Sequence, residues 1–250
     1  MKKPTAVVLA SPKFPDADAV KRILELRGWG VTEKKPDFVI TVGGDGSVLY
    51  AEAKYPGVPI IAFKAGALGF LACNEVEEIE EVLKAVEKGK YSIDSREKLE
   101  FSVPGKRELA LNEVLITSSL AGKALRLEIL VDSQRLGYFV CDGVLAATPT
   151  GSTGYNLSCG GPVIEPASGS YALTLINPHL SKLRSLVLSK SRVVEVRFTR
   201  SNPGITVVAD GLKSVKIGHN DVVVIKNSGK QARLVRTEND YFPSLEGLFT

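Results

Sequence analysis

The sequence of 250 residues predicts an α+β protein of two domains. Strand and helix patterns alternate at the start of the chain, which is typical of an α/β domain. After about Tyr91 the pattern changes to short strands of alternating apolar and polar residues, divided by Pro, Gly and Asn. The length allows two domains of ordinary size. We expect an N-terminal α/β domain at 1–92, a β-rich, mostly antiparallel domain at 93–236, and a tail at 237–250 that packs back on the first domain.

Apolar runs and helical patterns predict the elements of the N-terminal domain. Near-continuous apolar runs are typical of a parallel, Rossmann-like sheet that is covered on both faces. Apolar residues at helical spacing predict helices, and in the last of them acids come early and lysines late. The expected strands are 5–10, 37–42 and 58–63, and the expected helices are 17–29, 46–54 and 74–89.

The second domain is predicted from ten short segments with strand patterns. They are FSV, ELALNEVLI, LRLEILVD, LGYFVCD, YALTLI, LVL, VVEVRF, ITVVAD, SVKIG and DVVVIK. One turn-rich stretch, 148–162, interrupts them. A seam between two domains is a natural place for a ligand, so we expect the binding site there.

Composition argues against several classes of protein. Hydrophobic residues make up 44% and charged residues 24%, as in soluble globular proteins. No apolar run approaches the ~20 residues that span a bilayer. The apolar stretch 5–10 is too short for a secretion signal and is better interpreted as a core strand. Three cysteines without CxxC, and two histidines without HExxH, argue against a disulfide framework or a zinc site and favour the reducing cytoplasm.

The charge pattern does not indicate a nucleic-acid partner. The net charge of +4 comes from 32 basic and 28 acidic residues that are mixed along the chain. The nearest approach to a basic cluster is Lys226, Lys230, Arg233 and Arg236, whose spacing suits the solvated side of a strand pair. The mild positive charge could help attract an anionic small molecule.

Gly43, Gly44, Asp45 and Gly46 follow a buried strand and precede a helix. Glycines let the backbone approach a ligand closely, and the N–H groups of such a loop can hold phosphate oxygens. An aspartate would repel phosphate, so Asp45 makes sense if it holds Mg²⁺ or accepts a proton from an attacking hydroxyl. The alternative is a plain tight turn, because Asp-Gly is a common turn pair. The P-loop pattern GxxxxGK[ST] does not occur in the chain.

Two further segments carry polar side chains where the pattern does not require them. Asn112 and Glu113 interrupt an apolar strand and could hold the hydroxyls of a ribose, or could form a surface pair at a strand edge. The stretch 148–162 combines glycines, one aromatic ring and more hydroxyls than one helix cap needs, which favours a nucleotide-binding loop over simple capping. Its hydroxyl residues are Thr148, Thr150, Ser152, Thr153 and Ser158.

Taken together and in this order, six motifs resemble those of the NAD kinase family. They are GGDGS at 43–47, AGALGFL at 65–71, LNEV at 111–114, Asp142-Gly143, TPTGSTGYNLSCGGPVI at 148–164 and NPH at 177–179. The long motif is highly specific, whereas GGDG alone is shared with phosphofructokinases and with diacylglycerol and sphingolipid kinases. The resemblance implies transfer of the γ-phosphate of ATP, or of polyphosphate in some members, to the 2′-hydroxyl of the adenosine ribose of NAD. It also implies a homodimer or homotetramer.

The resemblance implies a role for each matching residue. Asp45 would be the general base, and Gly43, Gly44 and Gly46 would face the donor phosphates, with Mg²⁺ on those phosphates and no direct protein ligand predicted. Asn112 and Glu113 would hold the ribose, and Asp142 would meet the nicotinamide-riboside end. The other NAD-binding positions would be Gly46, Lys123, Thr150, Thr153, Gly154, Tyr155 and Ser158.

Some positions depart from the family pattern. Gly154 replaces a common alanine, Lys64 a frequent asparagine, Ser185 a frequent proline, and Leu212 the usual glutamine after Asp210-Gly211. These departures concern the choice of donor and of NAD or NADH more than the reaction. Three other functions stay open: another GGDG-type kinase, acting on a lipid or sugar phosphate, a non-catalytic dinucleotide sensor in which Asp45 closes a turn, and a structural scaffold protein that binds neither nucleotide.

Overall fold

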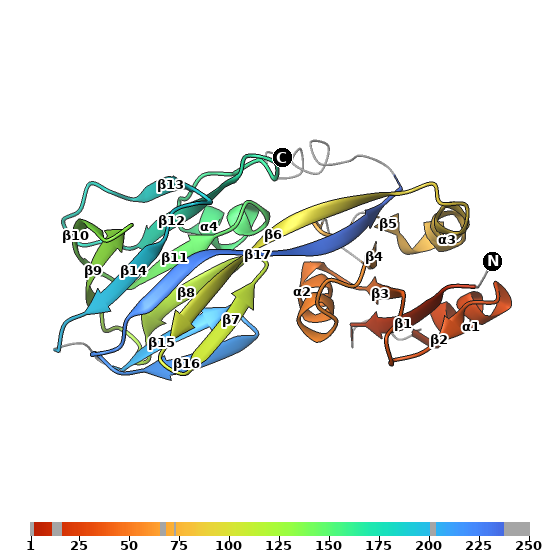
Figure 1. The fold of residues 1–250 in the computed structure, drawn as a ribbon, viewed down its shortest axis with the longest axis horizontal. Coiled ribbons are helices and arrows are strands. Elements are labelled where there is room, and N and C mark those ends of the chain that lie inside the picture. The colour runs from red at the N-terminus through yellow and green to blue at the C-terminus, as the bar shows by residue number, and fades with distance from the viewer. Residues whose placement is uncertain (1–2, 12–16, 66–68, 73, 201–203, 238–250) are drawn as a thin grey trace. The chain divides into compact units, whose positions relative to one another are not determined.

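The computed structural model describes residues 3–11, 17–65, 69–72, 74–200 and 204–237. The chain divides into two compact units, Met1–Ser95 with Gln231–Thr250, and Arg96–Lys230. The first unit contains alternating strands and helices, and the second consists almost entirely of strands (Figure 1). The predicted α+β fold class is therefore confirmed. The predicted packing of the tail concerns residues 238–250, which lie outside the described part of the chain.

A parallel sheet forms the centre of the first unit, with the strand order β17-β4-β3-β1-β2. Its strands are runs of apolar, often β-branched residues because both faces are covered, and the last four residues of β3 are buried. The three predicted strands are confirmed to within two residues at their ends. The strands are β1 (Thr5–Ala10), β2 (Gly30–Val31), β3 (Phe38–Val42), β4 (Ile60–Lys64), β5 (Asn74–Glu75) and β17 (Val223–Arg236).

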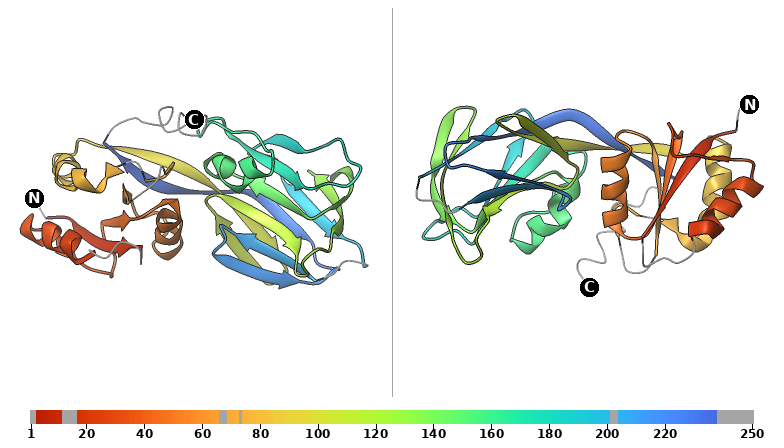
Figure 2. Two further views of the ribbon diagram at one scale, coloured as in Figure 1. Left: turned by 180° about the vertical axis from the view of Figure 1, so that it is seen from behind. Right: turned by 90° about the horizontal axis from the view of Figure 1, so that it is seen from below.

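Helices cover both faces of this sheet (Figure 2). The apolar sides of α1 (Ala17–Leu26) and α3 (Ile79–Glu87) pack in one cluster with β1, β3 and β4. On the opposite face, α2 (Asp45–Lys54) buries Val48 and Ala51. The predicted helix 74–89 begins later than expected, because β5 and the 3₁₀ turn η1 (Val76–Glu78) precede α3.

Two antiparallel layers form the second unit. One sheet has the order β13-β12-β11-β8-β15-β16, and the other contains β10-β9-β14-β17, with β6 beside β17 and β7 beside β6. A single cluster of buried residues draws side chains from both sheets, so the layers pack face to face (Figure 2). The strands are β6 (Ser92–Val103), β7 (Lys106–Ala110), β8 (Glu113–Ser118), β9 (Leu125–Val131), β10 (Gln134–Cys141), β11 (Gly143–Ala147), β12 (Ser170–Ile176), β13 (Ser185–Ser189), β14 (Val194–Phe198), β15 (Ile205–Ala209) and β16 (Lys213–Ile217).

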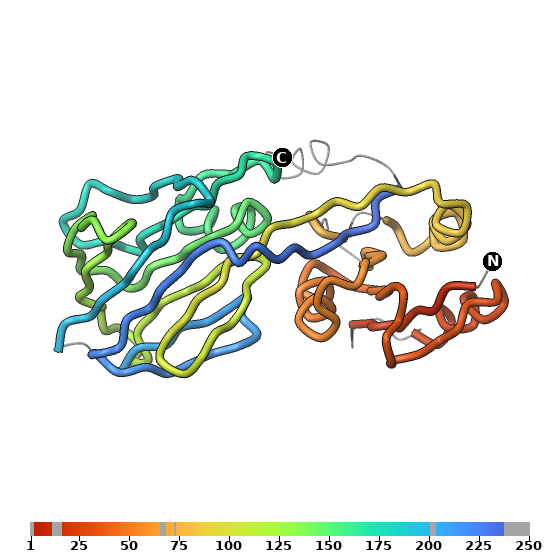
Figure 3. The backbone as a smooth tube through the Cα atoms, in the orientation of Figure 1, coloured from red at the N-terminus to blue at the C-terminus, as the bar shows by residue number. Residues whose placement is uncertain are grey.

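Several strands of the second unit differ from the prediction, among them β6, β7, β8 and β11. The sequence does not predict β11, whose five residues are all buried and therefore lack the alternation of a half-exposed strand. The expected single strand ELALNEVLI is broken into β7 and β8 at Leu111 and Asn112. The expected short strand FSV is the end of β6, which runs beside β17 (Figure 3).

The basic residues of β17 do not share one environment. Lys226, Lys230 and Arg233 are exposed, as their spacing predicts. Arg236 is only 9% exposed, so the prediction that it faces solvent is wrong. The alternation stops near Leu234, where β17 pairs with β4 in the parallel sheet and consecutive residues become buried.

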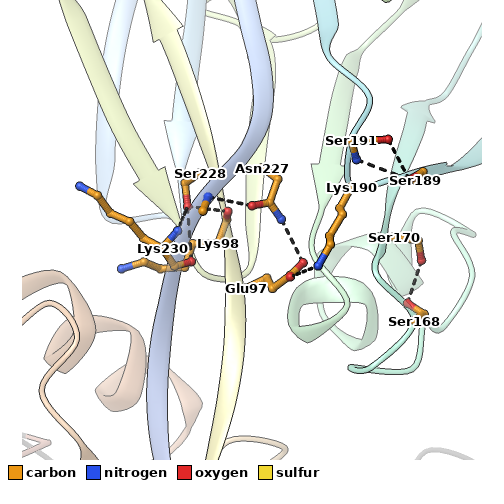
Figure 4. Close-up of polar contacts among 11 residues, drawn as sticks. Glu97, Lys98, Ser168, Ser170, Ser189, Lys190, Ser191, Asn227, Ser228 and Lys230 are labelled. Atoms are coloured by element: carbon orange, nitrogen blue, oxygen red, sulfur yellow. Dashed lines mark hydrogen bonds and ion pairs between the residues drawn. The ribbon is translucent and has the colours of Figure 1, made fainter.

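Polar contacts connect β6, β13 and β17 at the surface of the second unit (Figure 4). Lys190 Nζ lies 2.6 Å from Glu97 Oε1, and Asn227 Nδ2 donates to Glu97 Oε2 at 2.9 Å. The Ser228 hydroxyl donates to the Lys98 carbonyl at 2.8 Å. Because exposed ion pairs contribute at most about 1 kcal/mol, we interpret these contacts as local support for the strands.

A search of the described residues for helices long and apolar enough to cross a membrane finds none.

Candidate active site

The loop after β3 is shaped by its first glycine. Gly43 has a φ of +152°, and a Cβ there would lie 3.1 Å from Ser11 Cβ and 3.2 Å from Ser47 Oγ. Both the backbone angle and the space therefore require glycine. The Gly43 N–H donates to the Phe63 carbonyl at 2.9 Å, and the Ser47 hydroxyl donates to the Gly44 carbonyl at 2.6 Å. These contacts fix the direction in which the chain enters α2.

Gly44 and Gly46 need a different explanation. Gly44 has a φ of −87° and a ψ of −172°, which any residue adopts. Gly46 lies in the first turn of α2, where glycine costs about 1 kcal/mol relative to alanine. A Cβ at either position would meet no described atom within 4 Å. Since neither backbone strain nor packing explains these glycines, they leave room for a bound ligand.

A cavity of about 800 Å³ lies beside these glycines, within the first unit. Its volume is in the range of small-molecule sites, about 300–1,000 Å³. The first turn of a helix offers N–H groups that have no acceptor inside the helix, and these favour an anion. The cavity therefore suits the phosphates of a nucleotide. It is lined by Val8, Leu9, Ala10, Ser11, Gly44, Gly46, Ser47 and Tyr50.

Asp45 is held by the backbone of the segment 69–72. Its Oδ2 accepts the N–H of Phe70 at 2.9 Å, and its Oδ1 accepts those of Leu71 at 2.9 Å and Ala72 at 3.3 Å. A Cβ on Gly69 would lie 2.6 Å from Asp45 Oδ1, so only glycine allows this approach. An ionised carboxylate has roughly four acceptor positions. Three N–H donors therefore leave room for one more donor, such as a substrate hydroxyl.

The contacts of Asp45 explain a motif that carried no role in the sequence-based prediction. The segment AGALGFL supplies the three N–H groups that fix the carboxylate. The signal in the sequence that could have indicated this role was Gly69. A side chain at that position would prevent the Asp45 carboxylate from approaching the backbone. Residues 66–68 of this motif lie outside the described part of the chain.

In the second unit, Asp210 holds the turn between β7 and β8. Its carboxylate accepts the N–H groups of Leu111 at 2.7 Å, Asn112 at 2.7 Å and Glu113 at 3.1 Å. Asp210 follows β15 and has a φ of +52°, a backbone strain that these three hydrogen bonds offset. Sequence reasoning missed this residue, although the Asp-Gly pair after a strand marks it as a turn.

A second set of contacts holds the same turn from the loop 148–151. The Thr148 hydroxyl donates to the Leu111 carbonyl at 2.6 Å, and the Thr148 N–H donates to the Asn112 carbonyl at 2.9 Å. A Cβ at Gly151 would collide with the Asn112 carbonyl, so Gly151 is required by close packing. Asn112 and Glu113 are therefore held in place on both sides.

The side chains of Asn112 and Glu113 are in unusual environments. Within the described part of the chain, the buried Asn112 Oδ1 has no hydrogen-bond partner. An unpaired buried acceptor of this kind costs about 1–3 kcal/mol. Burial, with the charge of Asp210 beside it, raises the pKa of Glu113 to about 7. Both groups would be stabilised by hydroxyl donors from a ligand.

Tyr155 lies within range of the charges of two other predicted residues, Asp142 and Glu113. Burial is the main cause that raises the pKa of the Tyr155 phenol, and Cys159 and the charges of Asp142 and Glu113 add to it. Asp142 is exposed and accepts a hydrogen bond from Asn177 Nδ2 at 3.0 Å. Lys123 is exposed in the loop between β8 and β9, and in the described part of the chain it makes no hydrogen bond or ion pair with these side chains.

The hydroxyls of 148–162 divide into two groups. Thr148 and Ser152 are buried and hydrogen-bonded to the backbone, so they support the loop. Thr150 is also buried, and its hydroxyl lies 3.5 Å from Arg96 Nη1. Thr153 is half-buried, and Gly154, Tyr155 and Ser158 are exposed, beside the short helix α4 (Tyr155–Ser158) that follows the 3₁₀ turn η2 (Thr150–Thr153).

Asn156 is a structural residue that sequence reasoning did not single out. It is fully buried, its Nδ2 donates to the Pro162 carbonyl at 2.9 Å, and its Oδ1 accepts the Thr174 hydroxyl at 2.7 Å. A Cβ at Gly161 would collide with the Asn156 side chain. Asn156 therefore ties the loop to β12, and the glycine at 161 leaves room for it.

Among the described residues, no group of three or more histidine, cysteine or carboxylate side chains gathers as a metal site would require. Mg²⁺ in phosphate-transferring proteins is commonly held by one or two carboxylates together with substrate phosphates. Asp45 is the one carboxylate of the loop 43–47. A Mg²⁺ at this loop would therefore take most of its ligands from the phosphates of a bound donor.

We predict that Asp210→Asn destabilises the second unit. The amide places an N–H₂ group against backbone N–H donors, so the free energy of unfolding should fall by about 2 kcal/mol. Denaturant unfolding measures this change. Asp221→Asn is the matched control, because Asp221 accepts a single N–H, from Gly218 at 2.8 Å, and should cost less than half as much. Equal losses in the two variants would contradict the assigned role of Asp210.

Glu113 predicts a pH dependence of stability. Its pKa is higher in the folded chain than the ordinary value of 4.5, so the folded state binds the proton more tightly. Stability from this group is present below about pH 4.5 and is lost as the pH rises through about 7, by as much as about 3 kcal/mol. Glu113→Gln mimics the neutral form, so unfolding curves should show it gaining stability over the parent between pH 5 and pH 8.

Glu108→Gln is the control for this measurement. Glu108 lies on the neighbouring strand β7 and forms a surface ion pair with Lys213 at 2.8 Å. Its loss should change stability by at most about 1 kcal/mol, with no comparable gain at high pH. A flat difference between Glu113→Gln and the parent across this pH range would refute the burial of an ionisable Glu113.

Two family models match the chain. The ATP-NAD kinase N-terminal domain matches residues 16–91, and the ATP-NAD kinase C-terminal domain matches residues 111–237. An NAD kinase of Caldanaerobacter subterraneus is 36% identical over 216 residues, covering 83% of this chain and 76% of that protein. An NAD kinase of Methanothermobacter thermautotrophicus is 31% identical over 231 residues, covering 91% of this chain and 82% of that protein.

Solved structures agree with these matches. An NAD kinase from Archaeoglobus fulgidus in complex with ATP has a TM-score of 0.85 and 30% identity, and covers 97% of each chain. Yeast NADH kinase complexed with NADH shares the fold, with a TM-score of 0.89 at 21% identity over 99% of this chain and 87% of that one. On the sequence matches and the shared fold, this chain belongs to the NAD kinase family.

Proposed function

We propose that this protein transfers the γ-phosphate of ATP to the 2′-hydroxyl of the adenosine ribose of NAD and so makes NADP. The family's reaction is a phosphotransfer to an alcohol. The observation that carries the assignment of the ribose is the buried Asn112 Oδ1 beside Glu113, which no other described residue partners. Ribose hydroxyls are adjacent donors that would satisfy both side chains together, whereas diacylglycerol carries a single free hydroxyl.

The proposed donor site is the cavity beside Gly44 and Gly46. The bare glycines and the first turn of α2 favour a polyanion. The relative from A. fulgidus was solved with ATP, which supports ATP as the donor. Mg²⁺ bound to the donor phosphates would neutralise the charge that develops during transfer.

In this proposal Asp45 is the general base. Phosphoryl transfer depends mainly on positioning and on charge, and the acceptor hydroxyl must lose its proton as the new P–O bond forms. The three N–H donors fix both carboxylate oxygens, and the remaining acceptor position can take the hydroxyl proton. Asp45 also orients the hydroxyl toward the phosphorus.

The remaining predicted residues complete the substrate site. Thr153, Tyr155 and Ser158 are proposed to line the adenine pocket, with Gly154 leaving space there, and the exposure of the Tyr155 ring supports stacking on a base. Asp142, held by Asn177, is proposed to meet the nicotinamide-riboside end. Thr150, whose side chain is buried, and Lys123, whose side chain is exposed, are also proposed to bind NAD.

Cellular location and assembly stay predictions. The free thiols of Cys141 and Cys159 are compatible with the reducing cytoplasm. A homodimer or homotetramer is expected, and light scattering of the purified protein measures it.

The direct test supplies purified protein with Mg²⁺ and measures NADP formation. Parallel reactions use ATP or polyphosphate as donor and NAD, NADH, diacylglycerol or fructose 6-phosphate as acceptor. NADP from ATP and NAD is the expected product. Phosphorylation of the lipid or sugar only would overturn the proposal, and so would NAD binding by calorimetry without any NADP, the behaviour of a sensor.

We predict that Asp45→Asn folds and binds NAD but turns over at least about 100-fold more slowly, because removing a general base typically costs 10²–10⁴ in rate. Steady-state kinetics and calorimetry check the two parts. The control is Asp37→Asn, since Asp37 also accepts a backbone N–H, from Thr5 at 2.8 Å, but lies outside the loop 43–47. Unchanged turnover in Asp45→Asn would end the assignment of this base.

Gly46→Ala should separate stability from donor binding. Alanine is expected to stabilise α2 by about 0.5–1 kcal/mol, while its Cβ enters the proposed phosphate site. The KM for ATP should rise about tenfold, which corresponds to 1.4 kcal/mol. Ala53→Gly makes the reverse change at the other, exposed end of α2 and should lower stability without affecting the KM for ATP. A normal KM for ATP in Gly46→Ala would contradict the donor site.

A further inference from the structure

Arg236 is a buried cation that the predicted site does not include. It is the last residue of β17 and is 9% exposed. Its Nε lies 3.2 Å from Asp94 Oδ2, and its Nη1 donates to the Leu71 carbonyl at 3.1 Å. A buried ion pair is weak evidence for stability, because desolvation offsets much of the attraction. Stability alone therefore does not explain why Arg236 is buried where it donates a hydrogen bond to the Leu71 carbonyl.

The carbonyl that Arg236 binds belongs to the peptide group that also binds Asp45. The Leu71 C=O and the Ala72 N–H are the two ends of one planar unit. Arg236 Nη1 donates to the oxygen at 3.1 Å, and the N–H donates to Asp45 Oδ1 at 3.3 Å. A donor on the carbonyl polarises the peptide and strengthens the hydrogen bond on its other side.

The segment 69–72 has no regular secondary structure of its own. Gly69, Phe70, Leu71 and Ala72 lie in no helix or strand, so no backbone ladder fixes them. They nevertheless supply all three N–H groups that hold the Asp45 carboxylate. The contact of Arg236 with the Leu71 carbonyl is therefore well placed to orient the segment.

We propose that Arg236 positions Asp45 through the Leu71–Ala72 peptide group. This inference rests on the proposed function, in which Asp45 is the general base. Arg236 touches neither substrate nor reacting atom here, and it acts by orienting the carboxylate. A displacement of about 1 Å in a catalytic group can cost up to 10²-fold in rate.

The test begins with Arg236→Lys in the full chain. Lysine keeps the charge beside Asp94 but lacks the fork that reaches both partners. The kcat should fall at least about tenfold, while the KM for NAD should change less than about threefold, because the ribose ligands lie on β8 and its preceding turn. Arg27→Lys is the matched control. Arg27 belongs to the same unit and pairs with Glu87 at 2.7 Å, and its loss should leave kcat unchanged.

A double-mutant cycle with Asp45→Asn distinguishes positioning from general destabilisation. If Arg236 acts through Asp45, then Arg236→Lys should slow the parent enzyme at least about tenfold and should slow Asp45→Asn less than twofold. Equal factors in the two backgrounds would overturn the proposal, and so would an Arg236→Lys enzyme as fast as Arg27→Lys. If Arg236→Lys does not fold, the same double-mutant cycle is made with Asp94→Asn in place of Arg236→Lys. This variant should lower the kcat of the parent enzyme by less than tenfold and should leave the kcat of Asp45→Asn unchanged.

The proposed function and this inference fail in different ways. An Asp45→Asn enzyme with normal turnover would refute the general base itself. A slow Asp45→Asn enzyme together with a fast Arg236→Lys enzyme would refute only the positioning role of Arg236.

Discussion

In each unit, the predicted site residues depend on an aspartate that accepts three consecutive backbone N–H groups. Asp45 receives them from residues 70–72, and Asp210 receives them from residues 111–113. Charge-assisted hydrogen bonds of this kind are stronger than those between neutral groups. They let irregular segments keep one conformation without a helix or a strand ladder. The two aspartates differ in what the hydrogen bonds position. At Asp45 the backbone segment positions the carboxylate, whereas at Asp210 the carboxylate positions the backbone turn.

Glycine has a different purpose at each position of the site. Gly43 allows a backbone angle, and Gly69 and Gly151 allow close packing against Asp45 and Asn112. Among the described residues, Gly44 and Gly46 meet neither need. A glycine that neither backbone angle nor packing requires leaves space for a ligand. In the same part of the chain the buried Asn112 Oδ1 has no partner, which leaves an acceptor for a ligand.

Local pattern was sufficient to predict the first unit and the position of the loop 43–47. Parallel strands and amphipathic helices are defined within about ten residues, so β1, β3 and β4 were predicted nearly in full. The strand β11 was not, because a fully buried strand lacks alternation. The break between β7 and β8 could not be predicted either, since Asp210, which holds it, is 98 residues from Asn112 in sequence.

The site shows the same limit of sequence reasoning. Asp45, Asn112, Glu113 and Tyr155 could be named because they stand in short motifs. Arg236 could not, because its contact with Leu71 joins residues 165 positions apart and its spacing along β17 suggests a solvated side chain. The buried roles of Thr148 and Ser152 are also invisible in a stretch where every hydroxyl looks equally available.

A crystal structure with NAD bound is the decisive measurement. A carboxylate oxygen of Asp45 is expected within hydrogen-bond reach of the ribose 2′-hydroxyl, about 2.6–3.2 Å, while Asn112 and Glu113 contact the same sugar. An NAD molecule whose adenosine ribose contacts Asn112 and Glu113 but lies beyond the reach of Asp45, or one bound without touching either residue, would contradict this arrangement.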